Sequence, residues 1–245
     1  SFVRDMGRGL IMLGGDRSFG LGGYYHSPIA DAMPVHMDIK DKTHFPKLGM
    51  ILALDKSCSM GGGAGSKLAM AKEAAIETAN LLNTRDMLGV ISFDGAASWI
   101  VPFSDLHHRD HVVQQLSSLR SGGGTDIYPA LATSIQALEN SDAALKHVIL
   151  LSDGMTTSGD YQGLLQRATT NRITLTSIAI GSDADRTTMQ QLAEWGNGNY
   201  YLVTDPLSIP AVFTREAMLA TRAFLIEQRL HPQGASPSDL LKGLT

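Results

Sequence analysis

The chain has 245 residues, of which 43% are hydrophobic and 18% charged, a composition typical of a globular protein with one main core. Its net charge of -4 and its scattered Lys and Arg residues argue against a nucleic-acid-binding role. The single cysteine, Cys58, excludes an internal disulfide and a cysteine-based zinc site, and no apolar run reaches the roughly 18 residues of a membrane span.

From about Gly49 onward, short apolar runs alternate with amphipathic segments, which predicts strands and helices in turn. A run at 98–104 (SWIVPFS) is predicted to lie at a sheet edge, because Pro102 cannot donate a ladder hydrogen bond. Four other runs, rich in Ile, Val and Leu, are typical of buried parallel strands: 49–55 (GMILALD), 87–94 (MLGVISFD), 147–153 (HVILLSD) and 173–181 (ITLTSIAIG).

Helical patterns lie between the predicted strands. In the segment 67–82, apolar residues recur at i, i+3 and i+4 while charged residues occupy another face. Further helices are predicted at 129–138, where Pro129 suits a first turn, at 161–169 and at 185–195. Strands alternating with helices predict an α/β fold: a doubly wound, mostly parallel central sheet with helices on both faces.

Oxygen-bearing side chains gather where these strands end. Asp55 and Asp153 end two strands, and the carboxyl ends of the strands together form one rim of the sheet. The glycine-rich loop 121–126 (SGGGTD) leads into the helix at Pro129 and is predicted to lie on this same rim. In open α/β sheets, ligands bind at the carboxyl ends of the strands. Ser57 and Ser59 alternate with Asp55, so the chain can point all three at one spot. The predicted metal site consists of Asp55, Ser57, Ser59, Thr125 and Asp153.

This set suits a small hard cation. Mg²⁺ prefers about six oxygen ligands in an octahedron at about 2.0–2.1 Å. Two carboxylates balance its charge and the hydroxyls add neutral ligands, but the shell stays incomplete. We therefore expect a position open to an outside ligand, for which an Asp or Glu of a partner is the natural donor.

Three segments resemble, in the same order, the metal-ion-dependent adhesion site of von Willebrand factor type A (VWA) domains. They are DKSCSM at 55–60, GGTD at 123–126 and LLSDG at 150–154. The resemblance covers about 48–221 and implies the sandwich fold of that family. It also implies that the five residues bind Mg²⁺, or Mn²⁺ or Ca²⁺, directly or through water. The metal would then recruit an acidic residue of a protein partner, in some members with movement of a C-terminal helix.

The flanking segments 7–35 and 232–244 resemble a glutamine amidotransferase-like domain that a VWA domain interrupts in some large bacterial membrane proteins. This resemblance implies an N-terminal extension at 1–47, a VWA domain at 48–221 and a C-terminal extension at 222–245, in a bacterial membrane-anchored parent. Glutaminase chemistry needs a cysteine nucleophile, and Cys58 lies in the metal loop, which argues against that activity.

Several of these motifs also have other interpretations. Each site residue alone could be an ordinary helix cap. The segment 61–67 (GGGAGSK) lacks the Gly before Lys of a phosphate-binding loop, so no nucleotide is expected. The run 107–111 (HHRDH) could suggest a transition-metal site but is better explained as a solvated helix start. Cys58 alternates with the site residues, so we expect a buried, inert thiol.

These observations favour a metal-dependent protein-binding module that is not an enzyme. One alternative is an architectural domain that the metal stabilises within a larger membrane protein. The other is a metal-dependent hydrolase, which needs a general base beside the metal. Only Asp126 offers a spare rim carboxylate for that role, and it could instead be a helix cap.

Overall fold

The computed structural model describes residues 46–61, 63, 65–153, 159–182 and 184–222. The two segments that resemble an amidotransferase-like domain, and Gly154 of the LLSDG motif, lie outside the described residues. The domain boundaries at 47 and 221 therefore remain predictions.

Six strands form one sheet in the order β3-β2-β1-β4-β5-β6. All neighbours pair in parallel except β2 and β3, which are antiparallel. The strands are β1 (Leu48–Asp55), β2 (Met87–Phe93), β3 (Ala97–Asp105), β4 (Leu145–Ser152), β5 (Ile173–Ile180) and β6 (Tyr200–Val203). Pro102 lies in the edge strand β3, as predicted.

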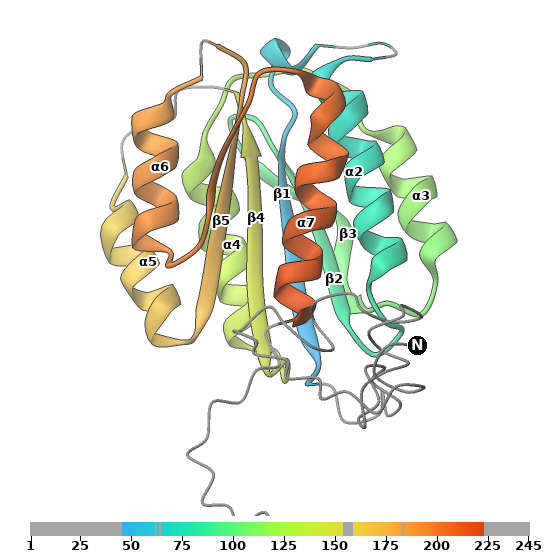
Figure 1. Ribbon diagram of the computed structural model, residues 1–245, viewed down its shortest axis with the longest axis vertical. Helices are drawn as coiled ribbons and strands as arrows, with labels where there is room; N and C mark the ends of the chain where they lie inside the picture. Colours follow the sequence, from blue (N-terminus) through green and yellow to red (C-terminus); the bar gives the residue numbers. More distant parts are fainter. Residues whose placement is uncertain (1–45, 62, 64, 154–158, 183, 223–245) are drawn as a thin grey trace, which may run out of the picture.

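Six helices in the described part of the chain cover the two faces of the sheet (Figure 1). One face carries α2 (Lys67–Leu81), α3 (Arg109–Ser118) and α7 (Ile209–Arg222), and the other carries α4 (Ile127–Glu139), α5 (Tyr161–Thr170) and α6 (Arg186–Trp195). This confirms the predicted doubly wound α/β sandwich. None of these helices, within the residues described, combines the length and the hydropathy needed to cross a bilayer.

The central strand β1 is buried along its whole length. Met50 and Leu52 pack into the core beneath α2 and α7, whereas Ile51 and Ala53 pack into the core beneath α4 and α5. Because both faces bury apolar side chains, a one-residue slip would exchange the two cores. The register of β1 is therefore strongly specified, and with it the position of Asp55 at the end of the strand.

The strand order reverses between β1 and β4. The chain builds β2 and β3 on one side of β1, then crosses to β4 and continues through β5 to β6 on the other. In open α/β sheets, ligands bind in the crevice at such a reversal, outside the carboxyl ends of the strands. Leu54 pairs with Leu151 across this boundary, so the next residues, Asp55 and Ser152, lie side by side.

Helix α7 is anchored to the sheet by a buried acid. Glu216 is 2% exposed and accepts hydrogen bonds from Thr176 Oγ1 at 2.7 Å, Asn199 Nδ2 at 3.2 Å and Tyr201 Oη at 2.5 Å. His147 Nε2 lies 3.9 Å from Glu216 Oε2. These polar groups fix where α7 packs, since an unpartnered buried carboxylate would be costly.

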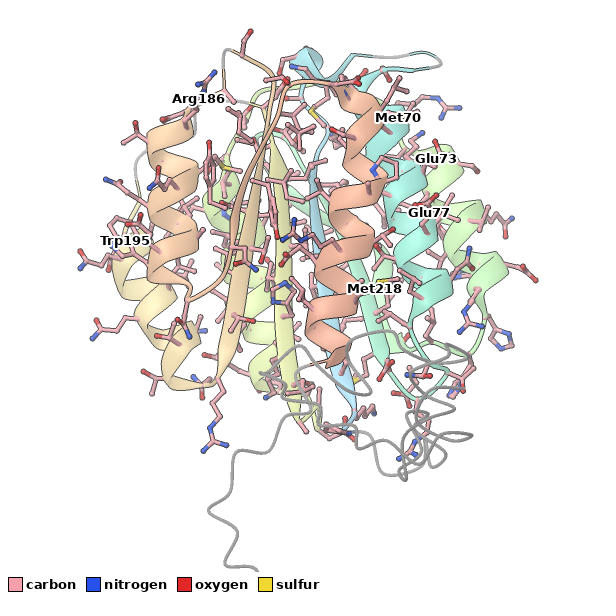
Figure 2. The ribbon with its side chains drawn as sticks, in the orientation of Figure 1. Met70, Glu73, Glu77, Arg186, Trp195 and Met218 are labelled. Atoms are coloured by element: carbon pink, nitrogen blue, oxygen red, sulfur yellow. The ribbon has the colours of Figure 1, made fainter. Side chains whose placement is uncertain are left out.

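On its outer side, α7 also contacts α2. Thr214 Oγ1 of α7 donates a hydrogen bond of 3.4 Å to Glu77 Oε2 of α2. Glu77 is exposed and is labelled in Figure 2. The two helices run side by side over β1 (Figure 1).

Two helix starts differ from the sequence prediction. Helix α4 begins at Ile127, two residues earlier than predicted, because the side chain of Asp126 accepts a hydrogen bond from Tyr128 N at 3.1 Å and caps the helix there. Helix α3 begins at Arg109, so His107 lies before the helix and does not share a helical face with His111. The exposed start predicted for this segment is confirmed.

Candidate metal centre

Asp55 ends β1 as a carboxylate with no solvent exposure. Its Oδ1 accepts a hydrogen bond of 2.7 Å from Ser57 N, and its Oδ2 accepts one of 2.6 Å from Ser152 Oγ. Burial raises the pKa of Asp55, while its hydrogen bonds to Ser152 and Ser57 oppose that effect. A positive charge placed close to Asp55 would therefore stabilise its ionised carboxylate.

Hydroxyl groups connect the first strand end to the second. Ser57 Oγ and Ser59 Oγ lie 3.0 Å apart, and Ser59 Oγ donates a hydrogen bond of 2.7 Å to Asp153 Oδ1. Asp153 directly follows β4 and is 3% exposed. Four of the five predicted residues are therefore brought together in one hydrogen-bonded chain, which starts at Asp55 and ends at Asp153.

The loop that carries Thr125 lies against the same rim. Gly122 N donates to Lys56 O at 2.7 Å, and Cys58 N donates to Gly123 O at 3.3 Å. Gly123 has a φ of +88°, and a Cβ there would lie 2.7 Å from Asp94 Cβ, so only glycine allows this approach. The half-buried Thr125 follows, but among the described residues its side chain forms no hydrogen bond with the other four.

Lys67, at the start of α2, adds a positive charge to the cluster. Its Nζ lies 2.6 Å from Asp153 Oδ2, whose side chain is fully buried, while the Lys67 side chain is 21% exposed. From the sequence, Lys67 is predicted to begin a helix but is not assigned to the metal site. Ser152 was missed as well, although its place beside Asp55 follows from the pairing of the two strand ends.

The donor set fits a hard divalent cation better than a soft one. Its side chains offer only carboxylate and hydroxyl oxygens, which are the ligands preferred by Mg²⁺ and Ca²⁺. No group of three or more His, Cys, Asp or Glu residues suited to a metal occurs in the described part of the chain. The ammonium group of Lys67 pairs with one of the two carboxylates, Asp153, and would lie beside a bound cation.

Cys58 differs from its prediction: it is exposed rather than buried. The alternation expected for an extended chain ends at Ser57, because Cys58–Met60 form a short 3₁₀ turn. In such a turn, side chains repeat every three residues instead of every two. Met60 consequently takes the buried position.

Comparisons with known proteins identify a relative of this chain. An uncharacterized protein of Synechocystis sp. is 26% identical over 163 residues, which are 65% of this chain and 38% of that protein. The chain thus spans less than half the length of this curated relative.

Solved structures show the same fold. A von Willebrand factor type A protein from Catenulispora acidiphila has a TM-score of 0.65 at 23% identity, with 72% of this chain and 43% of that chain covered. Proximal thread matrix protein 1 of the mussel byssus, with a zinc-occupied MIDAS motif, has a TM-score of 0.59 at 18% identity, with 72% and 48% covered. The family profile described as von Willebrand factor type A domain matches residues 50–215, more than half of the sequence. The chain therefore belongs to the von Willebrand factor type A domain family.

Proposed function

We propose that this chain is a metal-dependent protein-binding module. A divalent cation, with Mg²⁺ as the first candidate and Mn²⁺ or Ca²⁺ as alternatives, would be held by Asp55, Ser57, Ser59, Thr125 and Asp153. An acidic residue of a protein partner would supply the remaining ligand. The observation that carries the proposal is the pair of buried carboxylates at the strand-order reversal, which are linked through the backbone N–H of Ser57 and the hydroxyls of Ser57 and Ser59.

The surrounding residues hold these ligands in place. Ser57 N and Ser152 Oγ fix both oxygens of Asp55, and Ser59 Oγ orients Asp153. Hydrogen bonds that orient ligands in this way strengthen metal binding. When bound, the cation supplies a Lewis-acidic position for a carboxylate. The zinc-occupied MIDAS motif of the mussel protein supports a divalent metal at this rim.

The module is proposed not to be an enzyme. Hydrolysis assisted by the metal needs a base that can accept a proton from water. Asp126, the spare rim carboxylate named from the sequence, uses its side chain to cap α4 through Tyr128 N. That use supports a binding role over hydrolysis.

An architectural role is the second candidate. Asp55 and Asp153 end neighbouring strands and are both buried, so a cation between them would join two loops of the domain. This role predicts that the metal stabilises the fold and that no acidic ligand is needed.

Asp55→Ala separates the two candidates, with Asp110→Ala on the exposed first turn of α3 as the matched control. Thermal unfolding would be measured with Mg²⁺ and with EDTA. Binding to capped peptides that carry one Glu, or one Gln in its place, would be measured by fluorescence anisotropy. We expect the unmodified chain and the control to bind the Glu peptides only with Mg²⁺, and Asp55→Ala to fold without binding.

Two results would contradict the binding role. If Glu and Gln peptides bind equally, or not at all, in Mg²⁺ while the metal still raises the unfolding temperature, the architectural role is correct. Metal-dependent turnover of peptide, phosphate or ester substrates by the unmodified chain, lost in Asp55→Ala, would show a hydrolase instead.

A further inference from the structure

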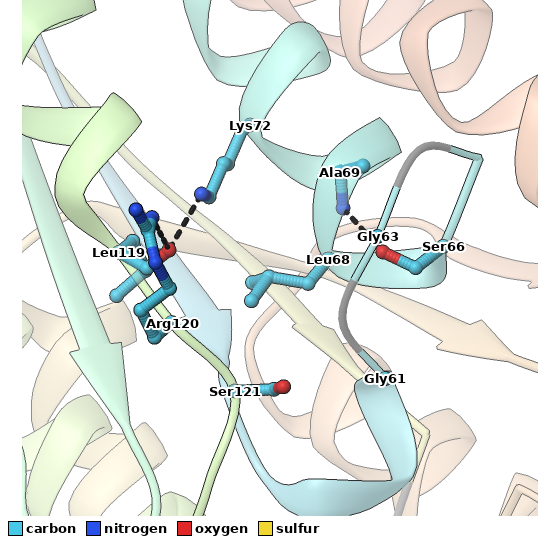
Figure 3. Close-up of a pocket in the computed structure, with 9 residues that line it drawn as sticks. All are labelled: Gly61, Gly63, Ser66, Leu68, Ala69, Lys72, Leu119, Arg120 and Ser121. Carbon is cyan, nitrogen blue, oxygen red and sulfur yellow. Dashed lines mark hydrogen bonds between the residues drawn. The ribbon is translucent and has the colours of Figure 1, made fainter.

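A pocket of about 440 Å³ lies near the loops of the candidate metal centre, and Figure 3 shows the residues that line it. It lies between the loop after η3 (Cys58–Met60), the first turns of α2 and the segment that joins α3 to α4. Gly61 follows the metal-loop serines by two residues, and Ser121 precedes the Thr125 loop, so the pocket shares the rim of the sheet with the metal centre. Its volume is within the range of sites that bind small groups.

Two cations, Lys72 and Arg120, line this pocket and donate hydrogen bonds to backbone oxygens. Lys72 Nζ donates a hydrogen bond of 2.6 Å to Leu119 O, and Arg120 Nη1 donates to the same oxygen at 3.1 Å and to Ser117 O at 2.7 Å. In the portion of the chain that the structure describes, no carboxylate forms a salt bridge with either side chain. Figure 3 shows both side chains converging on Leu119.

The other basic residues of the rim differ in this respect. Lys56 pairs with Asp94, and Lys67 pairs with Asp153. Burial, and then the charge of Arg120, lower the pKa of Lys72, so the two cations are held together at an electrostatic cost. An anion from outside would remove this cost.

The rest of the lining indicates which anion fits. Leu68 and Leu119 are almost fully buried and give the pocket an apolar wall, while Ser66 and Ser121 add hydroxyls. A glutamate side chain has two methylene groups for the apolar wall and a carboxylate for the cations. Aspartate is one methylene shorter and would bury less apolar surface.

We propose that this pocket binds a second acidic side chain, preferably Glu, of the same partner segment that places its first acid on the metal. The inference rests on the proposed function, and it makes that function more specific: the partner carries two acids rather than one. The first acid supplies metal-dependent binding, and the second supplies affinity and selectivity through Lys72 and Arg120.

The test uses capped peptides with one Glu, or with two Glu separated by a graded series of neutral spacers, in Mg²⁺. We expect one spacing to bind about tenfold more tightly than the single-Glu peptide, as a charge-assisted contact would give. Lys72→Gln and Arg120→Gln should abolish this gain and leave single-Glu binding unchanged. Lys146→Gln is the matched control and should keep the gain, because Lys146 lies at the start of β4, at the opposite end of the strand from the rim.

The outcomes separate this inference from the proposed function. If single-Glu peptides bind with Mg²⁺ but no spacing improves on them, or if the gain survives both pocket variants, the second-acid pocket is wrong and the metal-dependent module stands. If no peptide shows metal-dependent binding, the proposed function fails. The pocket is then tested in EDTA by the amide NMR shifts of Ala69, Leu119 and Ser121 on addition of the two-Glu peptide. Shifts that Arg120→Gln removes would support an acid-binding pocket, and their absence would overturn it.

Discussion

At the scale of single residues, the rim combines buried acids with two kinds of basic group: one pairs with an acid, and the others line a pocket. Lys67 neutralises Asp153 at 2.6 Å, whereas Lys72 and Arg120 face a pocket. A divalent cation at the rim would meet the ammonium group of Lys67 beside one of its ligands. We therefore expect Lys67 to weaken metal binding at the proposed site and to stabilise the metal-free protein.

Lys67→Gln tests this dual effect. We expect Mg²⁺ affinity to rise about tenfold, because a like charge near the cation is removed. The free energy of unfolding in EDTA should fall by about 1–2 kcal/mol, because Asp153 keeps its burial but loses its ion pair. Calorimetric titration and urea unfolding measure the two quantities, with Lys146→Gln as the control. Weaker Mg²⁺ binding would mean that Lys67 positions Asp153 for the metal.

His147 is a buried titratable group away from the rim, near Glu216. It is 7% exposed, and its Nδ1 lies 2.7 Å from Thr174 Oγ1, while its Nε2 has no hydrogen-bond partner in the described part of the chain. Burial lowers the pKa of His147 from 6.5 to about 4, although the charge of Glu216 opposes the shift. The folded protein thus holds His147 neutral at pH values where the unfolded chain is already protonated.

The pH dependence of stability follows from the sign of this shift. The contribution of His147 is complete above pH 6.5 and is lost as the pH falls toward about 4, by up to about 3 kcal/mol in total. His147→Asn keeps a hydrogen-bonding side chain and should remove this part of the slope in urea unfolding between those pH values. His111→Asn, on the exposed side of α3, is the matched control. An unchanged slope in His147→Asn would contradict the assignment.

At the scale of elements, a close approach between two backbone segments restricts which residue can precede the edge strand β6. Gly198 precedes β6, and a Cβ at this position would lie 2.1 Å from Leu175 O and 2.6 Å from Leu175 C. These are backbone atoms of β5, so they cannot move without changing the pairing of β5 with β4, in which Leu175 lies opposite Val148. Glycine is therefore required where the chain returns to the sheet.

Gly198→Ala should lower the free energy of unfolding by about 3 kcal/mol, at the upper end of the usual cost of overpacking. Gly95→Ala is the matched control, since a Cβ there meets nothing within 4 Å. Thermal and urea unfolding check the difference between the two variants. Equal stability would show that the segment before β6 relaxes freely.

Elements with two buried faces were the most predictable from sequence. The strands β1, β2, β4 and β5 were predicted within about two residues, because continuous apolar runs are typical of parallel strands covered on both sides. No range was predicted for α3, which buries only Val112 and Leu116. The ranges of α7 and of the four-residue β6 were not predicted either. A strand as short as β6 carries little signal, whereas the 14-residue α7 is amphipathic and its pattern was missed.

Some features of the candidate site could likewise be predicted from the sequence, and others could not. The spacing of Asp55, Ser57 and Ser59 and the strand-end position of Asp153 were readable from the chain. The contact between Lys67 and Asp153 joins residues 86 positions apart, and it depends on how α2 packs against the end of β4. The exposure of Cys58 depends on a local 3₁₀ turn that interrupts the alternation.

At the scale of the whole molecule, binding of the proposed metal should be linked to stability. Removing the charge of Asp55 relieves the cost of burying a carboxylate, whereas removing the charge of Asp153 leaves Lys67 without its partner. The two acids should therefore behave alike toward the metal and differently toward folding.

Asp55→Asn and Asp153→Asn compare these effects. In EDTA we expect Asp55→Asn to unfold at the same temperature as the unmodified chain or higher, and Asp153→Asn to unfold earlier. Mg²⁺ at about 100 times its dissociation constant should stabilise the unmodified chain by about 2.7 kcal/mol and neither variant. Scanning calorimetry over a Mg²⁺ series measures all three. Stabilisation of both variants by Mg²⁺ would place the metal elsewhere.

The central position of β1 also determines how the domain would carry mechanical load. The strand runs from Leu48, at the end of the sheet opposite the rim, to Asp55 at the rim. It is paired in parallel with β2 on one side and with β4 on the other. Tension between a ligand at the rim and the opposite edge would act along β1. Both hydrogen-bond ladders would then be sheared together rather than opened one bond at a time, so the strand that ends in the candidate site is also the one best placed to resist being pulled out.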